Sequence, residues 1–424
     1  MKLLYLNLDR GIPVLGDKGA SVHVREFVTA AAGLGHEVVL AAATRGAGNA
    51  PPPARLLELQ FDPAPAPLAA ECDGLGLEPT ALEDPVLRRE VARLAYDRAL
   101  PERLDAALAA IGFVPDQVYE RHALFHRAGV AVAAARGVPR LLEVNAPLVE
   151  EQARFRGLRL EGVARAAETA SYRGADAVVA VSAQVAAHVR ASGGWSTPVH
   201  VVPNGVAVGR YDDTAGGAAI RARLGLGAGP VIGFIGSFKP WHGMGFLLDV
   251  FAALAARRPD ARLLAVGEGP ELAAVAERVA ARGLGDRVLL PGRVAHAEVP
   301  AWLAAMDLTA APYLPQPDFY FSPLKLFESF AAGRPVVAPR LGQVGELIAP
   351  GQTGFLYDAG DAAGCLAALE ALLDDPARCR AMGQAARGQV ASRGWDRTVA
   401  RILALVPAPG EAAGPALRAR VLAS

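Results

Sequence analysis

A regular alternation of short apolar runs with helix-like segments constrains the fold most. In the first half the strand-like runs are KLLYLN, EVVLAAA, DQVYE, RLLEV and DAVVAVS, and a helical pattern follows each of them. The second half repeats the alternation with VIGFIGSF, RLLAVGEG, RVLLPG, DLTAAPY, PVVAP and GFLYD. Strands that alternate with helices form a parallel sheet covered by helices on both faces. We therefore predict an α/β chain with two doubly wound domains.

The domain boundary is predicted at the turn signal Pro203-Asn204-Gly205, which separates the two series of strands. The expected domains are 1–204 and 205–390, followed by a C-terminal segment, 391–424. The segment after Pro407 is rich in alanine, proline and glycine, and we expect it to be mobile. Residues 44–85, with NAPPPAR and FDPAPAPLA, are expected to form a loop-rich excursion.

The composition excludes several classes of protein. With 424 residues and 52% hydrophobic side chains, the chain can bury two cores. Its formal net charge is zero, which argues against a nucleic-acid partner. The three cysteines are far apart and form no disulfide or metal pattern, so we expect reduced thiols and a cytoplasmic protein. The start, MKLLYLNLDRG, is interpreted as a strand rather than a signal peptide, and no apolar run is long enough to span a membrane.

Polar residues cluster where predicted strands end, which is where doubly wound sheets bind ligands. The candidates in the first half are Gly19, Glu120, His122, Glu143 and Asn145, and those in the second half are Gly236, Ser237, Lys239, His242, Gly267, Glu268 and Val294. In GSFKPWHG, Gly236 would let a ligand approach the backbone, and Lys239 and His242 would offer positive charge to phosphates. The alternative is an ordinary loop between a strand and a helix.

The stretch FYFSPLKLFESFAAGRPVVAP is the most informative. Ser322 is predicted to cap a helix that begins at Leu324, and the free N–H groups at that helix start would suit an anion. Lys325 and Glu328 are three residues apart and share one helix face. Their neighbours are apolar, so the two charges need partners, although a surface ion pair is the simpler alternative. A lysine could meet a diphosphate, and a carboxylate could accept the hydroxyls of a ribose.

Two histidines, His122 and His126, are four residues apart and could form a metal pair. No third ligand at a matching spacing is evident, so we predict no metal site. His122 is expected near a binding cleft, and His126 on a helix surface. His23 could serve packing only.

The arginine-rich run VEEQARFRGLRLEGVARAAE could face an anionic membrane or an acidic acceptor. We favour a solvated helix with the pairs Glu150–Arg154 and Glu161–Arg165.

The ordered motifs KGASVHVREF, YERH, LLEVNAPL, VVPNGV, GSFKPWHG, VGEGP, PGRV, AAPY and SPLKLFESFAAGRPVVAP resemble the family-four retaining glycosyltransferases of the GT-B fold. The resemblance runs from about Lys2 to Val406. It implies two Rossmann-like domains that face each other across a cleft, with the donor in the C-terminal half and the acceptor bound mainly by the N-terminal half. It also implies that the last helix crosses back to the first domain.

The family's donor residues map onto named positions here. Glu328 matches the second glutamate of the paired-glutamate motif, which holds the donor ribose. The residues that match the loop facing the donor sugar and phosphate are Ser322, Pro323 and Leu324. Gly19 matches the glycine near the diphosphate, and Val294 matches the base-contacting position.

Three positions depart from the family pattern. Tyr320 stands where the first motif glutamate belongs, and Asn145 stands at the usual histidine. Ser237 and His242 replace an arginine and a lysine. The chain resembles a branch that carries EVNAP, KPWHG and SPLK together, in which Lys239 and Lys325 would supply the phosphate charge.

The expected activity is a hexosyl or related transfer from a nucleoside diphosphate sugar, UDP- or GDP-linked, to a hydroxyl of a glycan, lipid or small molecule. The configuration would be retained, with no metal and no cofactor. Lys325 and Lys239 would stabilise the leaving diphosphate, and the residues orienting hydroxyls would be Asn145, His122, Glu120 and Glu143. Membrane contact would be at most peripheral, at the inner face. The alternatives are a GT-B nucleotide-sugar epimerase and a non-catalytic nucleotide-sugar-binding subunit.

Overall fold

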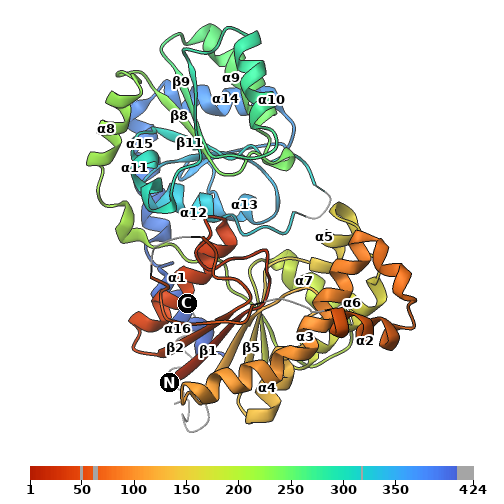
Figure 1. Cartoon of the computed structure of the whole chain (residues 1–424). Coiled ribbons are helices and arrows are strands. Elements are labelled where there is room, and N and C mark those ends of the chain that lie inside the picture. Colours follow the sequence, from red (N-terminus) through yellow and green to blue (C-terminus); the bar gives the residue numbers. More distant parts are fainter. Residues whose placement is uncertain (48–50, 61–64, 317–318, 408–424) are drawn as a thin grey trace. The chain divides into compact units, whose positions relative to one another are not determined.

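The computed structural model describes residues 1–47, 51–60, 65–316 and 319–407. The tail predicted to be mobile, after Pro407, lies outside these residues, as do parts of NAPPPAR and FDPAPAPLA. Contacts divide the chain into two compact units (Figure 1). The N-terminal unit is Met1–Pro203 together with the chain from Trp395, and the C-terminal unit is Asn204–Gly394.

The N-terminal unit is built on a seven-stranded parallel sheet with the order β3-β2-β1-β4-β5-β6-β7. Its strands are β1 (Lys2–Asn7), β2 (Glu37–Ala42), β3 (Arg55–Glu58), β4 (Gln117–Arg121), β5 (Arg140–Val144), β6 (Ala177–Ala180) and β7 (Val199–Val201). Its helices are α1 (Gly19–Gly33), α2 (Pro65–Leu75), α3 (Pro85–Ala110), α4 (Ala128–Arg136), α5 (Leu148–Phe155), α6 (Glu161–Arg173), α7 (Ala183–Ala191) and α16 (Trp395–Leu403), with a 3₁₀ turn at Pro79–Glu83. The strand order reverses between β1 and β4.

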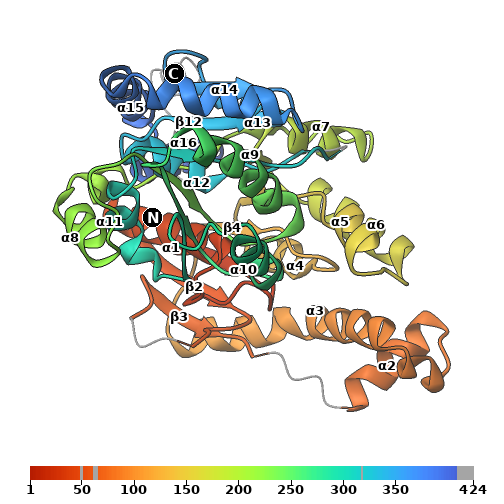
Figure 2. The ribbon, with the colours of Figure 1, turned by 90° about the horizontal axis from the view of Figure 1, so that it is seen from above.

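The excursion expected at residues 44–85 is more regular than predicted. Strand β3 pairs in parallel with β2 at the edge of the sheet, and α2 packs against the long α3 (Figure 2). Helix α2 begins at Pro65, and a proline in the first turn of a helix loses no backbone hydrogen bond. A four-residue edge strand carries too short a pattern to be recognised.

The C-terminal unit repeats this design with six parallel strands in the order β10-β9-β8-β11-β12-β13. Its strands are β8 (Val231–Ile235), β9 (Arg262–Val266), β10 (Val288–Gly292), β11 (Leu308–Ala310), β12 (Val336–Pro339) and β13 (Gly354–Tyr357). Its helices are α8 (Ala215–Arg223), α9 (Met244–Arg257), α10 (Leu272–Ala281), α11 (Val299–Ala304), α12 (Leu324–Ala331), α13 (Gly342–Leu347), α14 (Ala362–Leu373) and α15 (Pro376–Val390), with 3₁₀ turns at Val208–Tyr211, Pro240–His242 and His296–Glu298. Here the order reverses between β8 and β11. The prediction of two parallel-sheet Rossmann-like domains is confirmed.

Each unit has its own apolar core, because its strands are covered on both faces. In the N-terminal unit Phe27 of α1 stacks on Tyr119 of β4, with ring centroids 4.1 Å apart, and Tyr5 meets both rings. In the C-terminal unit Phe234 of β8 and Phe251 of α9 are fully buried. Burying one such side chain contributes about 1.5–3 kcal/mol, so the strand-and-helix layers are held mainly by these contacts.

Helix α16 belongs to the N-terminal unit, where it packs against α1. The Trp395 ring meets His23 edge-on, with centroids 4.9 Å apart, and Gln117 donates a 2.6 Å hydrogen bond to the carbonyl of Val406. None of the helices in the described ranges is long and apolar enough to cross a membrane.

Candidate functional site

In the C-terminal unit, helix α12 starts beside the point where the strand order reverses. It begins at Leu324, as predicted, but Ser322 does not cap it. The Ser322 hydroxyl instead accepts the backbone N–H of Asn204 at 3.4 Å, and its carbonyl accepts the Asn204 side chain at 2.9 Å. No side chain caps α12, so the N–H groups at its start keep the potential to bind an anion.

Lys325, in the first turn of α12, carries a buried amine. Its Nζ lies 4.8 Å from the ring centroids of both Phe234 and Tyr313, and it has no hydrogen-bond partner among the described residues. Burial lowers the pKa of this amine to about 7, although Glu328 acts in the opposite direction. The amine is therefore ready to gain a proton and a negatively charged partner.

Glycines after β8 and β9 allow the segments around Lys325 to pack closely together. Gly236 and Gly267 have φ angles of 146° and 143°, in the region that side chains rarely adopt. A Cβ on Gly236 would lie 2.8 Å from Lys325 Nζ, and one on Gly267 would lie 1.8 Å from the Gly236 carbonyl. Only glycine fits at both positions, so the loops after β8 and β9 and the start of α12 meet at one place.

His242 does not supply the positive charge that was predicted for it. Its Nδ1 lies 2.5 Å from the carbonyl oxygen of Ser237, so Nδ1 carries the proton and donates it. Burial, and then the charge of Lys325, lower the His242 pKa to about 3. The ring is neutral near pH 7, with a lone pair on Nε2. Lys239 lies over the Trp241 ring at 4.8 Å.

Glu328 pairs with His296 rather than with Lys325. Its Oε1 is 2.7 Å from His296 Nε2, and both side chains are largely buried. Sequence reasoning missed His296, although it follows the PGRV motif closely. The predicted Glu268 forms an exposed 3.5 Å ion pair with Arg293, and the adjacent Val294 packs partly against the core.

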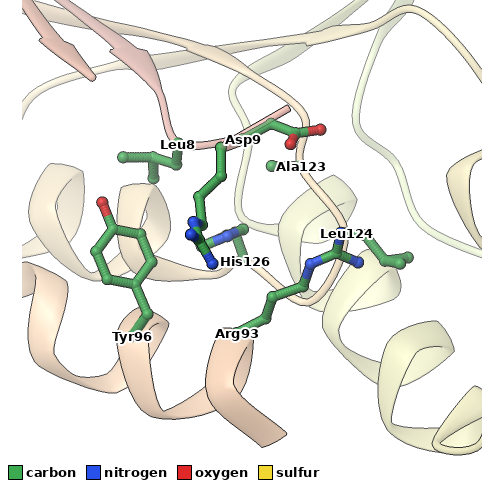
Figure 3. Close-up of a pocket in the computed structure, with 8 residues that line it drawn as sticks. Leu8, Asp9, Arg93, Tyr96, Ala123, Leu124 and His126 are labelled. Carbon is green, nitrogen blue, oxygen red and sulfur yellow. The ribbon is translucent and has the colours of Figure 1, made fainter. Parts of the chain in front are cut away.

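In the N-terminal unit a small pocket opens where strand order reverses between β1 and β4 (Figure 3). It is lined by Leu8, Asp9, Arg10, Arg93, Tyr96, Ala123, Leu124 and His126. The first three follow β1, the last three follow β4, and Arg93 and Tyr96 rise from α3 in Figure 3. The residues Asp9 and Arg10 could have been found from their place after the first strand. The α3 side chains carried no such signal.

His126 is part of this pocket and does not lie on a helix surface as predicted. It is 4% exposed and precedes α4, with its Nδ1 3.2 Å from Asp97. The same Asp97 oxygen accepts the backbone N–H groups of Arg127 and Ala128, each at 2.9 Å. Asp97 therefore fixes both the ring of His126 and the start of α4.

The predicted acceptor-side carboxylates are enclosed in the N-terminal unit. Glu143 lies 2.5 Å from His23 Nε2 and 3.0 Å from Arg121. Burial alone would raise the Glu143 pKa, but the charges of His23 and Arg121 outweigh it and lower the pKa to about 2. Glu120 forms a 2.6 Å pair with Arg140, and both side chains are 1% exposed. The pocket itself is lined by other residues.

The other predicted residues of this unit lie at strand or helix ends. Gly19 is the exposed first residue of α1, and Asn145 is half-buried after β5. His122 is 6% exposed, and neither of its ring nitrogens has a hydrogen-bond partner within the described ranges. Its Nε2 is 3.8 Å from Glu168.

The arginine-rich run forms two helices rather than one, α5 and α6. The predicted Glu161–Arg165 pair is present at 2.7 Å, but the predicted Glu150–Arg154 pair is wrong. Glu150 instead contacts Arg165 of the next helix at 2.8 Å, because the chain turns between α5 and α6. Glu150, Glu168 and His188 gather within reach of a single metal ion.

Comparison with known proteins identifies the family of the chain. Residues 18–210 match the family model described as Glycosyltransferase Family 4, and residues 229–375 match Glycosyl transferases group 1. The chain is 31% identical to D-inositol 3-phosphate glycosyltransferase 1 of Catenulispora acidiphila, over 80% of this chain and 82% of that protein. It is 32% identical to the GDP-mannose-dependent alpha-(1-6)-phosphatidylinositol monomannoside mannosyltransferase of Mycolicibacterium smegmatis, over 53% of this chain and 60% of that protein.

Two solved structures share the fold at low sequence identity. HepE of Anabaena in complex with UDP has a TM-score of 0.70 at 18% identity, over 96% of this chain and 100% of that chain. Sucrose-phosphate synthase of Thermosynechococcus elongatus has a TM-score of 0.71 at 20% identity, over the whole of both chains. Together with the match of the Catenulispora protein over most of its length, these findings show that the chain belongs to the family-four glycosyltransferases and is a glycosyltransferase of the GT-B fold.

Proposed function

We propose that the protein transfers a sugar from a nucleoside diphosphate sugar to a hydroxyl group, with retained configuration and without a metal in the transfer step. The observation that carries this proposal is the buried amine of Lys325, which has no hydrogen-bond partner among the described residues. A buried amine without a hydrogen-bond partner is costly unless a ligand pairs with it. The uncapped start of α12 lies beside it, so the two together suit a diphosphate.

The chemistry follows from where charge develops. When the bond from the sugar to the diphosphate breaks, the sugar gains oxocarbenium-like character and the diphosphate gains negative charge. Lys325 and the α12 N–H groups would stabilise that charge, with Lys239 as a second cation. The acceptor oxygen bonds to the anomeric carbon from the same face, and its proton passes to the departing diphosphate. Removing one such donor group typically costs about a hundredfold or more in rate.

Glu328 and His242 would hold the rest of the donor. The carboxylate of Glu328, fixed at 2.7 Å by His296, would accept the ribose hydroxyls. Neutral His242 has an Nε2 lone pair that can accept a hydroxyl of the transferred sugar. A neutral ring here also avoids competition with Lys325 for the diphosphate.

The acceptor would bind at the pocket of the N-terminal unit. Arg10, Arg93 and His126 line it together with Asp9, which suits a hydroxyl-rich acceptor that carries an anionic group. Two relatives named for D-inositol 3-phosphate support an acceptor of this kind. A relative named for GDP-mannose and a structural neighbour with UDP leave the two nucleotides as the first donors to test.

The test is thermal unfolding of the wild type, Lys325→Ala and Glu328→Ala with UDP, GDP, ADP or dTDP. A ligand at a hundred times its dissociation constant adds about 2.7 kcal/mol of stability. We expect one nucleotide to raise the wild-type midpoint and neither variant to respond. Lys2→Ala is the matched control, because it also removes a lysine, but one outside the proposed donor site. Lys2 lies at the start of β1 and forms a 4.0 Å pair with Glu37. If no nucleotide shifts the wild type, the donor assignment is wrong.

Product analysis then separates the activities. A glycosylated acceptor formed with retained configuration supports transfer. A donor that isomerises without any acceptor would instead indicate an epimerase, and binding without turnover over a broad acceptor panel would indicate a binding subunit.

A further inference from the structure

We propose that Glu150, Glu168 and His188 form a zinc-type divalent cation site in the N-terminal unit, with His122 orienting Glu168. These residues come from α5, α6, α7 and the end of β4. None of them belongs to the proposed donor site.

The donor atoms have the spacing that such an ion requires. One ligand atom from each of Glu150, Glu168 and His188 lies within 4.8 Å of the others. His188 Nε2 is 3.3 Å from Glu168 Oε1 and 3.7 Å from Glu150 Oε2. Zinc binds nitrogen and oxygen ligands at about 2.0–2.2 Å, so the ligands of a tetrahedral site lie roughly 3.4 Å apart. The two measured separations lie close to that value.

A second observation is independent of the three ligands. The side chain of His122 is buried, with an exposed fraction of 6%. Both of its ring nitrogens lack hydrogen-bond partners in the part of the chain that the structure describes. Its Nε2 points at Glu168 Oε2 from 3.8 Å, which is longer than a hydrogen bond. Leaving both nitrogens unsatisfied is costly. A cation on Glu168 would draw this pair together, since histidine–carboxylate contacts commonly orient zinc ligands.

The nearby arginine does not block the site. Arg165 contacts Oε1 of Glu150 at 2.8 Å, which leaves Oε2 of the same carboxylate buried and without a hydrogen bond among the described residues. Two carboxylates and one arginine leave a net negative charge for the cation to neutralise. A neutral His188 can offer its Nε2 lone pair once the proton has left.

The fourth coordination position would face solvent. The three ligands line a surface pocket together with Arg165, Thr169, Ala191 and Ser192. A water molecule bound there would exchange freely. The ion would also link three helices, and α5 and α6 lie side by side in Figures 1 and 2. We therefore expect metal to stabilise the N-terminal unit.

The experiment is calorimetric titration of the chelator-treated full chain with Zn²⁺ alone at pH 7.5. We expect one ion per chain with a dissociation constant of micromolar order or tighter, that is, about −8 kcal/mol. His188→Gln should weaken binding at least about tenfold, and His122→Gln should weaken it by about ten- to a hundredfold. Glu161→Gln is the matched control, because Glu161 contacts Arg165 at 2.7 Å but is not one of the three ligands.

Several outcomes would overturn the proposal. They are the absence of saturable binding up to about 100 μM zinc, equal affinity in His188→Gln, and equal loss in Glu161→Gln. The cluster would then be an ion-pair network only. Circular dichroism of each metal-free variant checks folding, and Glu150→Gln replaces any variant that fails to fold. Co²⁺ should give the visible absorption of a tetrahedral site in the wild type and lose it in His188→Gln.

Discussion

The protonation of Lys325 makes donor binding depend on pH in a way that can be calculated. In the free protein the pKa of this amine is about 7, so about half of the molecules carry the charge at pH 7. A bound diphosphate favours the charged form and raises the pKa again. Binding must therefore take up a proton wherever the free amine is neutral. The terminal phosphate ionises with a second pKa near 6, so it changes little above pH 7.

The expected magnitude follows from this linkage. If the pKa in the complex lies well above 9, the affinity for the nucleotide falls by about fiftyfold between pH 7 and pH 9. That change corresponds to roughly 2.3 kcal/mol of binding free energy. Below about pH 6 the amine contributes no further change in affinity, because it is then almost fully charged.

The assay is calorimetric titration of the best nucleoside diphosphate at pH 6 to 9, in buffers with different ionisation enthalpies. The wild type should take up about half a proton at pH 7 and nearly one at pH 9. Lys325→Met should bind weakly and lose this slope, whereas Lys325→Arg should keep its charge and bind without the slope. Lys2→Met is the control that should behave like the wild type.

Stability of the free protein gives a second readout with the opposite sign. Because the pKa of Lys325 is lowered on folding, the unfolded chain binds more protons between pH 7 and the usual lysine range. The wild type should therefore gain stability as pH rises through that window. Lys325→Met should unfold at a higher temperature than the wild type at pH 7 while binding the nucleotide less tightly. A flat affinity from pH 7 to pH 9, or the same slope in Lys325→Met, would refute this reasoning.

Three further predictions follow from buried polar pairs. His296→Ala should weaken nucleotide binding several-fold by releasing Glu328, with little change in the unfolding midpoint without ligand, whereas an equal loss of stability would assign His296 to packing. Glu143, with its pKa lowered to about 2, stabilises the fold at neutral pH and loses that contribution as pH falls from about 4.5 toward 2. In Glu143→Gln the free energy of unfolding, measured by urea titration, should fall less steeply over this acidic pH range. An unchanged pH dependence would contradict the assignment. Arg140→Met should cost about 3–5 kcal/mol in urea unfolding, because it leaves Glu120 buried and unpaired, and a loss below 1 kcal/mol would count against it.

The sequence predicted the strands well, because a parallel sheet buried on both faces leaves near-continuous apolar runs. The runs named above, from KLLYLN to GFLYD, are the strands β1 to β13 with the exceptions of β3 and β7. Edge strand β3 was missed because RLLE is only four residues long and none of its side chains is fully buried. The start of α12 was predicted at the right residue, since Pro323 limits where that helix can begin.

The partners of the site residues could not be predicted, because they come from distant elements. Glu328 and His296 are 32 residues apart in the sequence. Asp97 contacts His126 from helix α3, for which the sequence analysis made no prediction. The sequence shows that residue 242 is a histidine but does not show what surrounds it, so His242 was expected to be positively charged. Its burial beside Lys325 makes it neutral, which only the folded environment can show.

The placement of α16 has a consequence for synthesis of the chain. The N-terminal unit is interrupted by 191 residues of another unit and finished by the segment from Trp395 onward. Translation proceeds at about 5–20 residues per second. The face of α1 that contacts Trp395 therefore stays uncovered until the C-terminal unit has been synthesised. The inserted unit is continuous and can fold at once. Nascent chains arrested before Trp395 should therefore hold one finished unit and one that still offers an apolar surface to chaperones.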